Sequence, residues 1–426
     1  MAVLIRALPL LGAVGALLCA ATVSAGQERI PAEPVPVPWA ADTVADAPEP
    51  PDIVLPGVEP VYEEEAGGFP WLLELPGWWG VTVARYSRID GAVPAWGIEL
   101  APEDPSRWPT VEARVGLATT HERLYADVGI SQRLELADGT VGRIGVRWLH
   151  RGETFDGWKL SRRENDLATV LVGSDLMNWW RERGWRFSFG LESEFGDRSL
   201  EVSLLAVEQF SQRNRSPWVL FGDGDFRDNP PVAEGDLRSV GLRYVHDGRD
   251  VQSPLLPAPG WVIELATETA VEGFGGDIEF LRAFADVRRY LRFGSDTWWD
   301  HRLVVHAGRD VPVQRRPVLG GAGSLRGFPA GSIVGDEFAV QASTEARWPL
   351  PITDWIAPLF LSWHVVGLAD AGTVDPDLEE WHADVGAGLS GINIFSYLGV
   401  FVAQRVTDLD GDETGPRWIV RLRRDF

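Results

Sequence analysis

One arginine and two carboxylates stand out in the C-terminal half of the sequence. Arg326 follows a run rich in glycine, and Glu345 and Asp370 each lie in a segment that alternates apolar and polar residues. Because glycine allows tight turns and positive φ, the segment before Arg326 can fold away from a regular strand. A guanidinium presents a planar fork that suits bidentate contacts with carboxylates. We therefore expect Arg326 to form an ion-paired cluster with Glu345 and Asp370.

The alternation also predicts where the two carboxylates point. Counting every second residue places Glu345 on the same face as Gln341 and Arg347, which is the polar face of that segment. In the next segment Asp370 shares a face with His364, opposite a row of apolar residues. Both carboxylates are therefore expected on the polar side of one sheet.

Other chemistry is not indicated by the sequence. It has no G-x-S-x-G elbow, no H-E-x-x-H pair and no G-x-x-x-x-G-K-[ST] loop, so we expect no enzyme and no cofactor. Two acidic stretches, 408–413 and 223–228, resemble parts of Ca²⁺ loops, but solvated turns are expected because the bidentate Glu is missing. No metal site is expected from the scattered histidines, which are His121, His150, His246, His301, His306, His364 and His382.

The bulk composition excludes some classes of protein. The chain of 426 residues carries 62 acidic against 39 basic side chains, a net charge of -23. Nucleic-acid binding is therefore not expected, because it requires clustered Lys and Arg. The chain holds 20 Trp, and membrane barrels use aromatic residues heavily in girdles at both interfaces.

The N-terminus predicts export. Arg6 is followed by the apolar stretch Leu8–Ala21 and by the small residues Val23–Ala25. This is the pattern of a signal peptide over residues 1–25, cleaved near Ala25. Cys19, the only cysteine, lies in the apolar stretch, so the mature chain is expected to have no disulfide and no thiolate site.

Residues 26–78 form a Pro-rich, acidic segment, for which we expect a disordered periplasmic linker. Its last part, 69–76, is apolar and Pro-bounded; an interfacial or lumen-plugging segment and a plain linker remain open. After the signal peptide no apolar run reaches the length of a membrane-spanning helix. A chain that crosses a membrane without such a helix must do so as a closed barrel.

Residues 79–426 indicate that barrel. Short alternating segments are separated by Gly, Asp and Pro, and about sixteen can be counted. The fold class expected is all-β: a transmembrane antiparallel β-barrel with a short disordered N-terminal extension. The strands are expected at 79–87, 93–100, 109–118, 123–135, 141–150, 185–195, 199–211, 237–247, 261–271, 280–292, 299–309, 334–348, 361–370, 382–391, 397–406 and 416–426.

The connections alternate in length, as in outer-membrane barrels with short inner turns and long outer loops. Long outer loops are expected at 151–184, 212–236 and 310–333, with a helix over 165–183. In the last segment Trp418 and Val420 fall on one face and Arg421 on the other, as lipid outside and a wet lumen inside require.

Several motifs resemble those of the BamA/TamA superfamily, also known as the bacterial surface antigen family. Leu319–Phe328 (LGGAGSLRGF) looks like the signature LGG-x(3)-LRG-F/Y, and Thr344–Pro349 and Gly367–Val374 look like the next two family motifs. Tyr244–Asp250 resembles Y-D-x-R-D at a strand end. Arg85–Gly91 is similar to the opening segment of shorter members without periplasmic POTRA repeats. The resemblance covers about 79–426 and includes motifs in family order.

The resemblance implies that the sixth outer loop folds back into the barrel and is pinned there. Whether such a pin only stabilises the barrel or also takes part in transport is left open by the sequence. The residues expected to form it are Arg326, Gly327, Phe328, Glu345 and Asp370, with the loop glycines Gly320, Gly321 and Gly323.

The resemblance also implies a function. We expect a non-enzymatic protein of the Gram-negative outer membrane that inserts or translocates proteins through a lateral seam between its terminal strands. The alternatives are a gated pore or export channel for lipid or solute, and a surface-exposed structural or binding protein. Expected partners are outer-membrane lipids, lipopolysaccharide, and client outer-membrane or secreted proteins. A periplasmic partner, the role of 26–78 and the oligomeric state do not follow from the sequence.

Overall fold

The structure is a computed structural model, and it divides the chain into two units, Met1–Phe69 and Pro70–Phe426. The expected signal peptide and most of the expected linker lie outside the described residues. The acidic stretch 408–413 also lies outside them. The residues described are 71–74, 81–136, 139–215, 217–221, 224–249, 258–294, 297–350, 362–392, 397–407 and 415–422.

The second unit is an antiparallel β-barrel, which confirms the expected fold class. Its wall has sixteen strands, β2–β12 and β15–β19. These are β2 (Val81–Ser87), β3 (Gly91–Pro102), β4 (Thr110–Ala118), β5 (Arg123–Glu135), β6 (Val141–Glu153), β7 (Trp180–Glu192), β8 (Arg198–Ser211), β9 (Gly235–Asp247), β10 (Gly260–Ala270), β11 (Phe280–Phe293), β12 (Thr297–Arg309), β15 (Phe338–Pro349), β16 (Ser362–Thr373), β17 (His382–Ile392), β18 (Tyr397–Arg405) and β19 (Arg417–Arg421).

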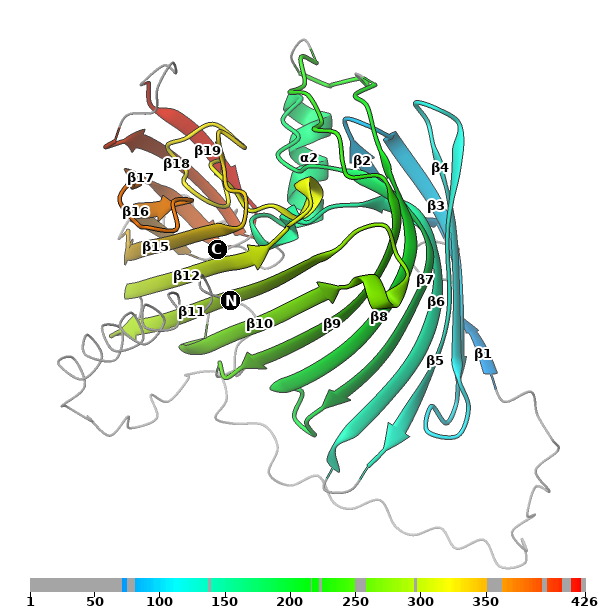
Figure 1. Cartoon of the computed structure of the whole chain (residues 1–426). Coiled ribbons are helices and arrows are strands. Elements are labelled where there is room, and N and C mark those ends of the chain that lie inside the picture. Colours follow the sequence, from blue (N-terminus) through cyan, green and yellow to red (C-terminus); the bar gives the residue numbers. More distant parts are fainter. Residues whose placement is uncertain are drawn as a thin grey trace, which may run out of the picture. The chain divides into compact units, whose positions relative to one another are not determined.

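Each wall strand pairs with the next one along the chain, from β2 through to β19 (Figure 1). Long connections gather at one end of the barrel, above the strands in this view, and the helix α2 (Arg162–Val172) lies among them. The other helical segments among the described residues are the 3₁₀ helices η2 (Asp156–Trp158), η3 (Glu272–Phe274) and η4 (Val313–Arg315).

The two faces of the wall differ in polarity, as period-2 alternation requires. On β19, Trp418 and Val420 are 76% and 60% exposed, whereas Ile419 and Arg421 are buried. The outward apolar row continues around the wall, with Trp96, Leu117, Ile130, Ile144, Phe187, Leu204, Leu242, Leu265, Val385 and Leu389 all exposed. The inward face instead buries charged and polar side chains, including Asp286, Asp300, Arg302, Glu345, Arg347, Asp370 and Asp384.

The helix in the third outer loop is shorter than expected. Its N-terminus has a reciprocal cap, in which Ser161 Oγ accepts from the Glu164 N–H and also bonds the Glu164 carboxylate. It ends at Gly173, whose φ of 70° is left-handed and stops the helix. The expected small helix in this loop is therefore confirmed, but it spans Arg162–Val172 instead of 165–183, and β7 begins at Trp180 instead of 185. Among the described residues no helix is long and apolar enough to cross a membrane.

The segment before the barrel contributes one short strand. β1 (Trp71–Glu74) pairs with the last part of β3, from Trp71 opposite Pro102 to Glu74 opposite Glu99. β2 pairs with the first part of β3, from Ser87 opposite Gly91 to Val81 opposite Trp96. This segment was left open as a lumen plug or a plain linker, and the structure instead adds it to the edge of the sheet.

Candidate functional site

The sixth outer loop, residues 310–337, joins β12 to β15 and contains the glycine-rich motif. Its two ends are paired as the small hairpin β13 (Val318–Leu319) and β14 (Ile333–Val334). Leu319, Leu325 and Phe328 are fully buried and pack together with Ile333 on the inside of the loop. This apolar cluster gives the loop a core of its own, so the residue that follows Leu325 is held in a fixed position.

That residue is Arg326, and the structure places it between the two expected carboxylates. Its Nε lies 2.7 Å from Asp370 Oδ2 and its Nη2 lies 2.8 Å from Asp370 Oδ1, which is a bidentate contact. Its Nη1 donates to Glu345 Oε1. All three side chains are buried, with Arg326 only 3% exposed. The guanidinium of one loop therefore joins two neighbouring wall strands, β15 and β16.

The ion pairs continue along the wall. The other oxygen of Glu345 accepts from Arg347, and Arg347 also donates to Asp300 on β12. Burial by itself lowers the pKa of Arg326, but Asp370 and Glu345 outweigh it and raise this pKa above its ordinary value. Arg326 therefore stays cationic, and removing it would leave the buried carboxylate of Asp370 without its counter-charge and that of Glu345 with Arg347 alone.

Glycine is required at two places where the loop closely approaches other parts of the chain. A Cβ on Gly323 would lie 1.8 Å from the carbonyl oxygen of Lys159 in the third outer loop. A Cβ on Gly327 would lie 2.6 Å from Cβ of Asp384 on β17. Gly320 and Gly321 have φ of +95° and +97°, so they turn the chain in a way that other residues resist. These glycines explain how Arg326 reaches the wall.

Phe328 occupies a fully buried position beside the ion pairs. Its ring meets His382 edge-on with centroids 5.6 Å apart, and the guanidinium of Arg405 lies 5.4 Å from its centroid. The aromatic side chain thus contacts β17 and β18, which are further around the wall than the two strands that Arg326 joins. The structure therefore brings together all five residues expected to form the pin.

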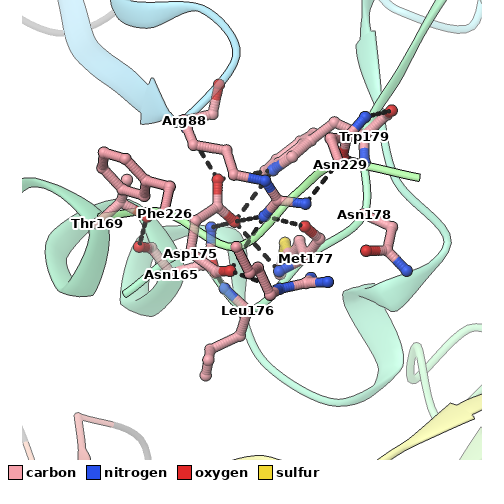
Figure 2. Close-up of polar contacts among 12 residues, drawn as sticks. Arg88, Asn165, Thr169, Asp175, Leu176, Met177, Asn178, Trp179, Phe226 and Asn229 are labelled. Carbon is pink, nitrogen blue, oxygen red and sulfur yellow. Dashed lines mark hydrogen bonds and ion pairs between the residues drawn. The ribbon is translucent and has the colours of Figure 1, made fainter. Parts of the chain in front are cut away.

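Arg88 is a second buried arginine, and the sequence did not predict that it would connect several outer loops. Arg88 lies in the turn between β2 and β3 and is fully buried (Figure 2). Its backbone N–H donates to Asp175 Oδ2 at 2.9 Å, and its Nη1 donates to the carbonyls of Asp175 and Met177 at 3.0 and 2.6 Å. Its Nη2 donates to Asn229 Oδ1 at 2.9 Å. Arg88 therefore ties the first, third and fourth outer loops together.

The partners of Arg88 are themselves connected. Asn229 accepts from the N–H of Trp179 at 2.9 Å and donates to its carbonyl at 2.8 Å. Asp175 accepts from the indole of Trp179 and from the side chain of Asn165 on α2 (Figure 2). The motif that contains Arg88 was noted only for its resemblance, because nothing in the local spacing predicts partners so far along the chain.

Metal binding finds no support in the described part of the chain, where no group of three or more His, Asp or Glu side chains is arranged to hold an ion. His306, His364 and His382 are buried in the wall as separate residues. Of the acidic stretch 223–228, Asp225 and Asp228 are described and Asp223 is not.

The Omp85 superfamily domain is the family model that matches the sequence, over residues 229–412. This range includes the glycine-rich loop and the strands to which it is bound. A comparison of the whole sequence with curated proteins gave no match.

Solved structures match the fold. BamA from Haemophilus ducreyi lacking POTRA domains 1–3 is similar with a TM-score of 0.52 and 15% identity, covering 79% of this chain and 69% of that one. CdiB from Acinetobacter baumannii (TM-score 0.40, 15% identity, 80% and 58% covered) and CdiB from Escherichia coli (0.42, 14%, 82% and 63%) also match. The chain spans less than two thirds of either CdiB.

The fold and the inward loop define the class first: an outer-membrane-type barrel that carries a folded-in, arginine-bound outer loop. Within this chain, residues 229–412 match the Omp85 superfamily domain, and the fold resembles the BamA barrel.

Proposed function

We propose that this barrel inserts or translocates proteins at the bacterial outer membrane, and that clients engage the seam between β2 and β19. The observation that carries this proposal is how the two terminal wall strands are held. In the described part of the chain, the residues that pair with β2 in the wall all lie on β3, and the residues that pair with β19 all lie on β18. The helix α2 stands between the two strands (Figure 1).

Side-chain contacts from α2 bind the last strand. Glu164 Oε1 accepts from the Leu422 N–H at 2.7 Å and from Arg421 Nε at 3.3 Å. On the other side, α2 packs against β2. Arg421 also donates to the carbonyl of Ala322 in the sixth outer loop at 3.1 Å. The helix and the pinned loop therefore both hold β19 from inside the barrel.

This arrangement supports a seam that opens without breaking a long ladder. Displacing α2 requires loss of a few polar contacts, each worth about 1.5–3 kcal/mol when a charged group is involved. A freed β2 edge would present backbone N–H and C=O groups to an incoming strand, which can add to the sheet. The Arg326 cluster would keep the part of the wall from β12 to β16, which is separated from β19 by β17 and β18, rigid while the seam moves.

The experiment uses the full chain reconstituted in liposomes with an unfolded eight-stranded outer-membrane barrel as client. One cysteine is introduced within 81–87 and one within 417–421, and pairs that form a disulfide on oxidation are selected. We expect wild type to speed the appearance of folded, protease-protected client, oxidation of the pair to abolish that effect, and reduction to restore it. Equal client folding with the seam oxidised and reduced would contradict the proposal. Ion conductance that persists in the oxidised variant would instead favour a pore.

The remaining parts of the proposal concern location and partners. Export with removal of residues 1–25 agrees with the barrel fold, and the outward apolar row agrees with lipid contact. Contact of the outer loops with lipopolysaccharide, and a linker role for the segment before β1, are included as parts of the same proposal.

A further inference from the structure

A cavity of about 500 Å³ lies inside the barrel, between the strands β2 to β6 and the helix α2. Three of its walls carry arginines: Arg85 from β2, Arg114 from β4, and Arg163 from α2. Tyr125 and Trp179 supply aromatic surface to the same cavity. Its size falls within the range of small-molecule sites, about 300–1,000 Å³.

The charges of this cavity are not balanced. Arg151 and Arg162 also line it, but both are bound by Glu153. Arg85, Arg114 and Arg163 form no ion pair with any carboxylate of the described residues, and all three are open to solvent. In a chain with a net charge of -23, three arginines facing one cavity without counter-ions run against the overall charge.

The aspartates of the cavity, Asp90, Asp127 and Asp166, compensate for these arginines only in part. Asp127 accepts from Arg147 at 2.9 Å and lies 3.5 Å from Arg151. Asp90 accepts from the Tyr125 hydroxyl at 2.6 Å and lies 3.0 Å from His121 Nε2. Asp90 and Asp127 are thus occupied by other partners. Asp166 also lines the cavity and attracts Arg85 without forming an ion pair with it. Most of the positive charge of the three arginines, and above all that of Arg114 and Arg163, is therefore left for a ligand.

We propose that this cavity is a binding site for a phosphate-bearing ligand, with Arg85, Arg114 and Arg163 as the groups that contact the phosphate. A phosphate oxygen triad matches several guanidinium forks at once. A cavity of about 500 Å³ exceeds the volume of inorganic phosphate, so the organic part of the ligand lies against Tyr125 and Trp179. The phosphate can come from a lipid headgroup or from a soluble phosphate ester.

The site goes beyond the proposed function, and it has a consequence for the seam. Arg163 belongs to α2 and Arg85 belongs to β2. A phosphate bound by both joins the helix to the first wall strand, so the occupied and the empty site differ in how firmly α2 is held.

The test is calorimetric titration of the refolded full chain in detergent and phosphate-free buffer. The probes are inorganic phosphate, dioctanoyl phosphatidic acid, and dioctanoyl phosphatidylcholine as the lipid without a free phosphomonoester. We expect Arg114→Gln and Arg163→Gln each to weaken binding at least about tenfold, since each removes charge-assisted hydrogen bonds. The matched control is Arg309→Gln, which removes the same charge from an arginine that is 72% exposed and outside the cavity.

The outcomes distinguish a lipid headgroup from a soluble phosphate ester as the source of the phosphate. Saturable binding of phosphatidic acid alone identifies a lipid headgroup, and binding of inorganic phosphate identifies a soluble phosphate. The proposal is overturned if neither inorganic phosphate nor phosphatidic acid binds, or if either arginine variant binds as tightly as wild type. Folding of each variant is checked by its compact gel mobility before heating. If Arg114→Gln does not fold, Arg114→Lys is titrated instead, with intermediate affinity expected.

Discussion

Arg326 donates two hydrogen bonds to Asp370, from Nε to Oδ2 at 2.7 Å and from Nη2 to Oδ1 at 2.8 Å. This contact fastens a loop to the inner wall of a barrel whose strands are otherwise joined by backbone ladders. Replacing Arg326 by Ala would leave Asp370 buried without its cation and Glu345 with Arg347 alone, at a cost of about 3–5 kcal/mol. We expect Arg326→Ala to lose its compact gel band at lower urea concentration than wild type, and Arg326→Lys to fall between them.

The control for this prediction lies on the same loop. Arg316 pairs with Asp336, whose side chain is 81% exposed, and exposed pairs contribute about 0–1 kcal/mol. Arg316→Ala should therefore unfold close to wild type. If Arg326→Ala and Arg316→Ala unfold at the same urea concentration, the Arg326 cluster contributes no special stability.

The contact between the third and sixth outer loops depends on Gly323. A methyl group there would overlap the carbonyl oxygen of Lys159, so Gly323→Ala must push the two loops apart. We expect a cost of about 1–3 kcal/mol and faster cleavage of both loops by external protease. Gly273→Ala is the control, because a Cβ at Gly273 meets nothing within 4 Å. Equal cleavage of the two variants would show that this close approach is unimportant.

Arg88 is expected to order the outer loops. Arg88→Ala removes hydrogen bonds to Asp175, Met177 and Asn229, so the third and fourth loops lose their shared partner. Hydrogen–deuterium exchange should rise by about tenfold or more in these loops, corresponding to at least one charged hydrogen bond, while the wall strands stay protected. Arg107→Ala, an exposed arginine in the turn between β3 and β4, should leave the loops unchanged. Unchanged exchange in Arg88→Ala would rule out this role.

Glu164 is expected to keep the seam shut. Glu164→Ala removes the acceptor for Leu422 and Arg421. In this variant the exchange of amide hydrogens should therefore become faster in β19 than in β18. Glu272→Ala, in the loop between β10 and β11, tests whether loss of any outer-loop carboxylate has this effect. The seam contact would be unimportant if β19 exchanged equally in both variants.

Asp166 makes the stability of α2 sensitive to pH. Burial raises the pKa of Asp166 to about 7, with Asp175 acting in the same direction, while the Tyr86 N–H, Arg85 and Arg162 act to lower it. Because the folded state binds the proton more tightly than the unfolded state, the stability that this group contributes is full below its ordinary pKa and is lost as pH rises through about 7. Amide exchange in α2, corrected for intrinsic rates, should therefore be faster at pH 8 than at pH 5.5.

Asp166→Asn isolates this effect. The amide cannot ionise, so the difference in α2 exchange between the two pH values should shrink in the variant. A difference as large as that of wild type would assign the pH dependence to other groups.

The sequence predicts the wall well and the loops less well. The strand expected at 123–135 coincides with β5, because a clear alternation ends in turn residues on both sides. The helix was misplaced because apolar spacing continues past Gly173, whereas the left-handed turn at that glycine ends the helix. The backbone conformation of a single residue can end a helix, so a periodic pattern that continues past this residue misleads about where the helix ends.

The candidate site shows the same limit. Period-2 counting places Glu345 and Asp370 on the lumenal face, and the structure has both there. It does not predict that Arg347 bridges Glu345 and Asp300, since many lumenal charges share that face and the choice depends on strand register. The partners of Arg88 were missed for a related reason: they lie on loops whose folding no local pattern describes.

Pairing of each wall strand with its chain neighbour has a consequence for how the protein assembles. Every ladder can form as a hairpin, one after another, with only the loop between two neighbouring strands to close each time. The contacts of Arg326, Arg88 and Glu164 are different, because they join segments far apart in the chain and require the wall to be present already. Refolding should therefore show early gain of β-structure and a later, slower phase in which the loops dock.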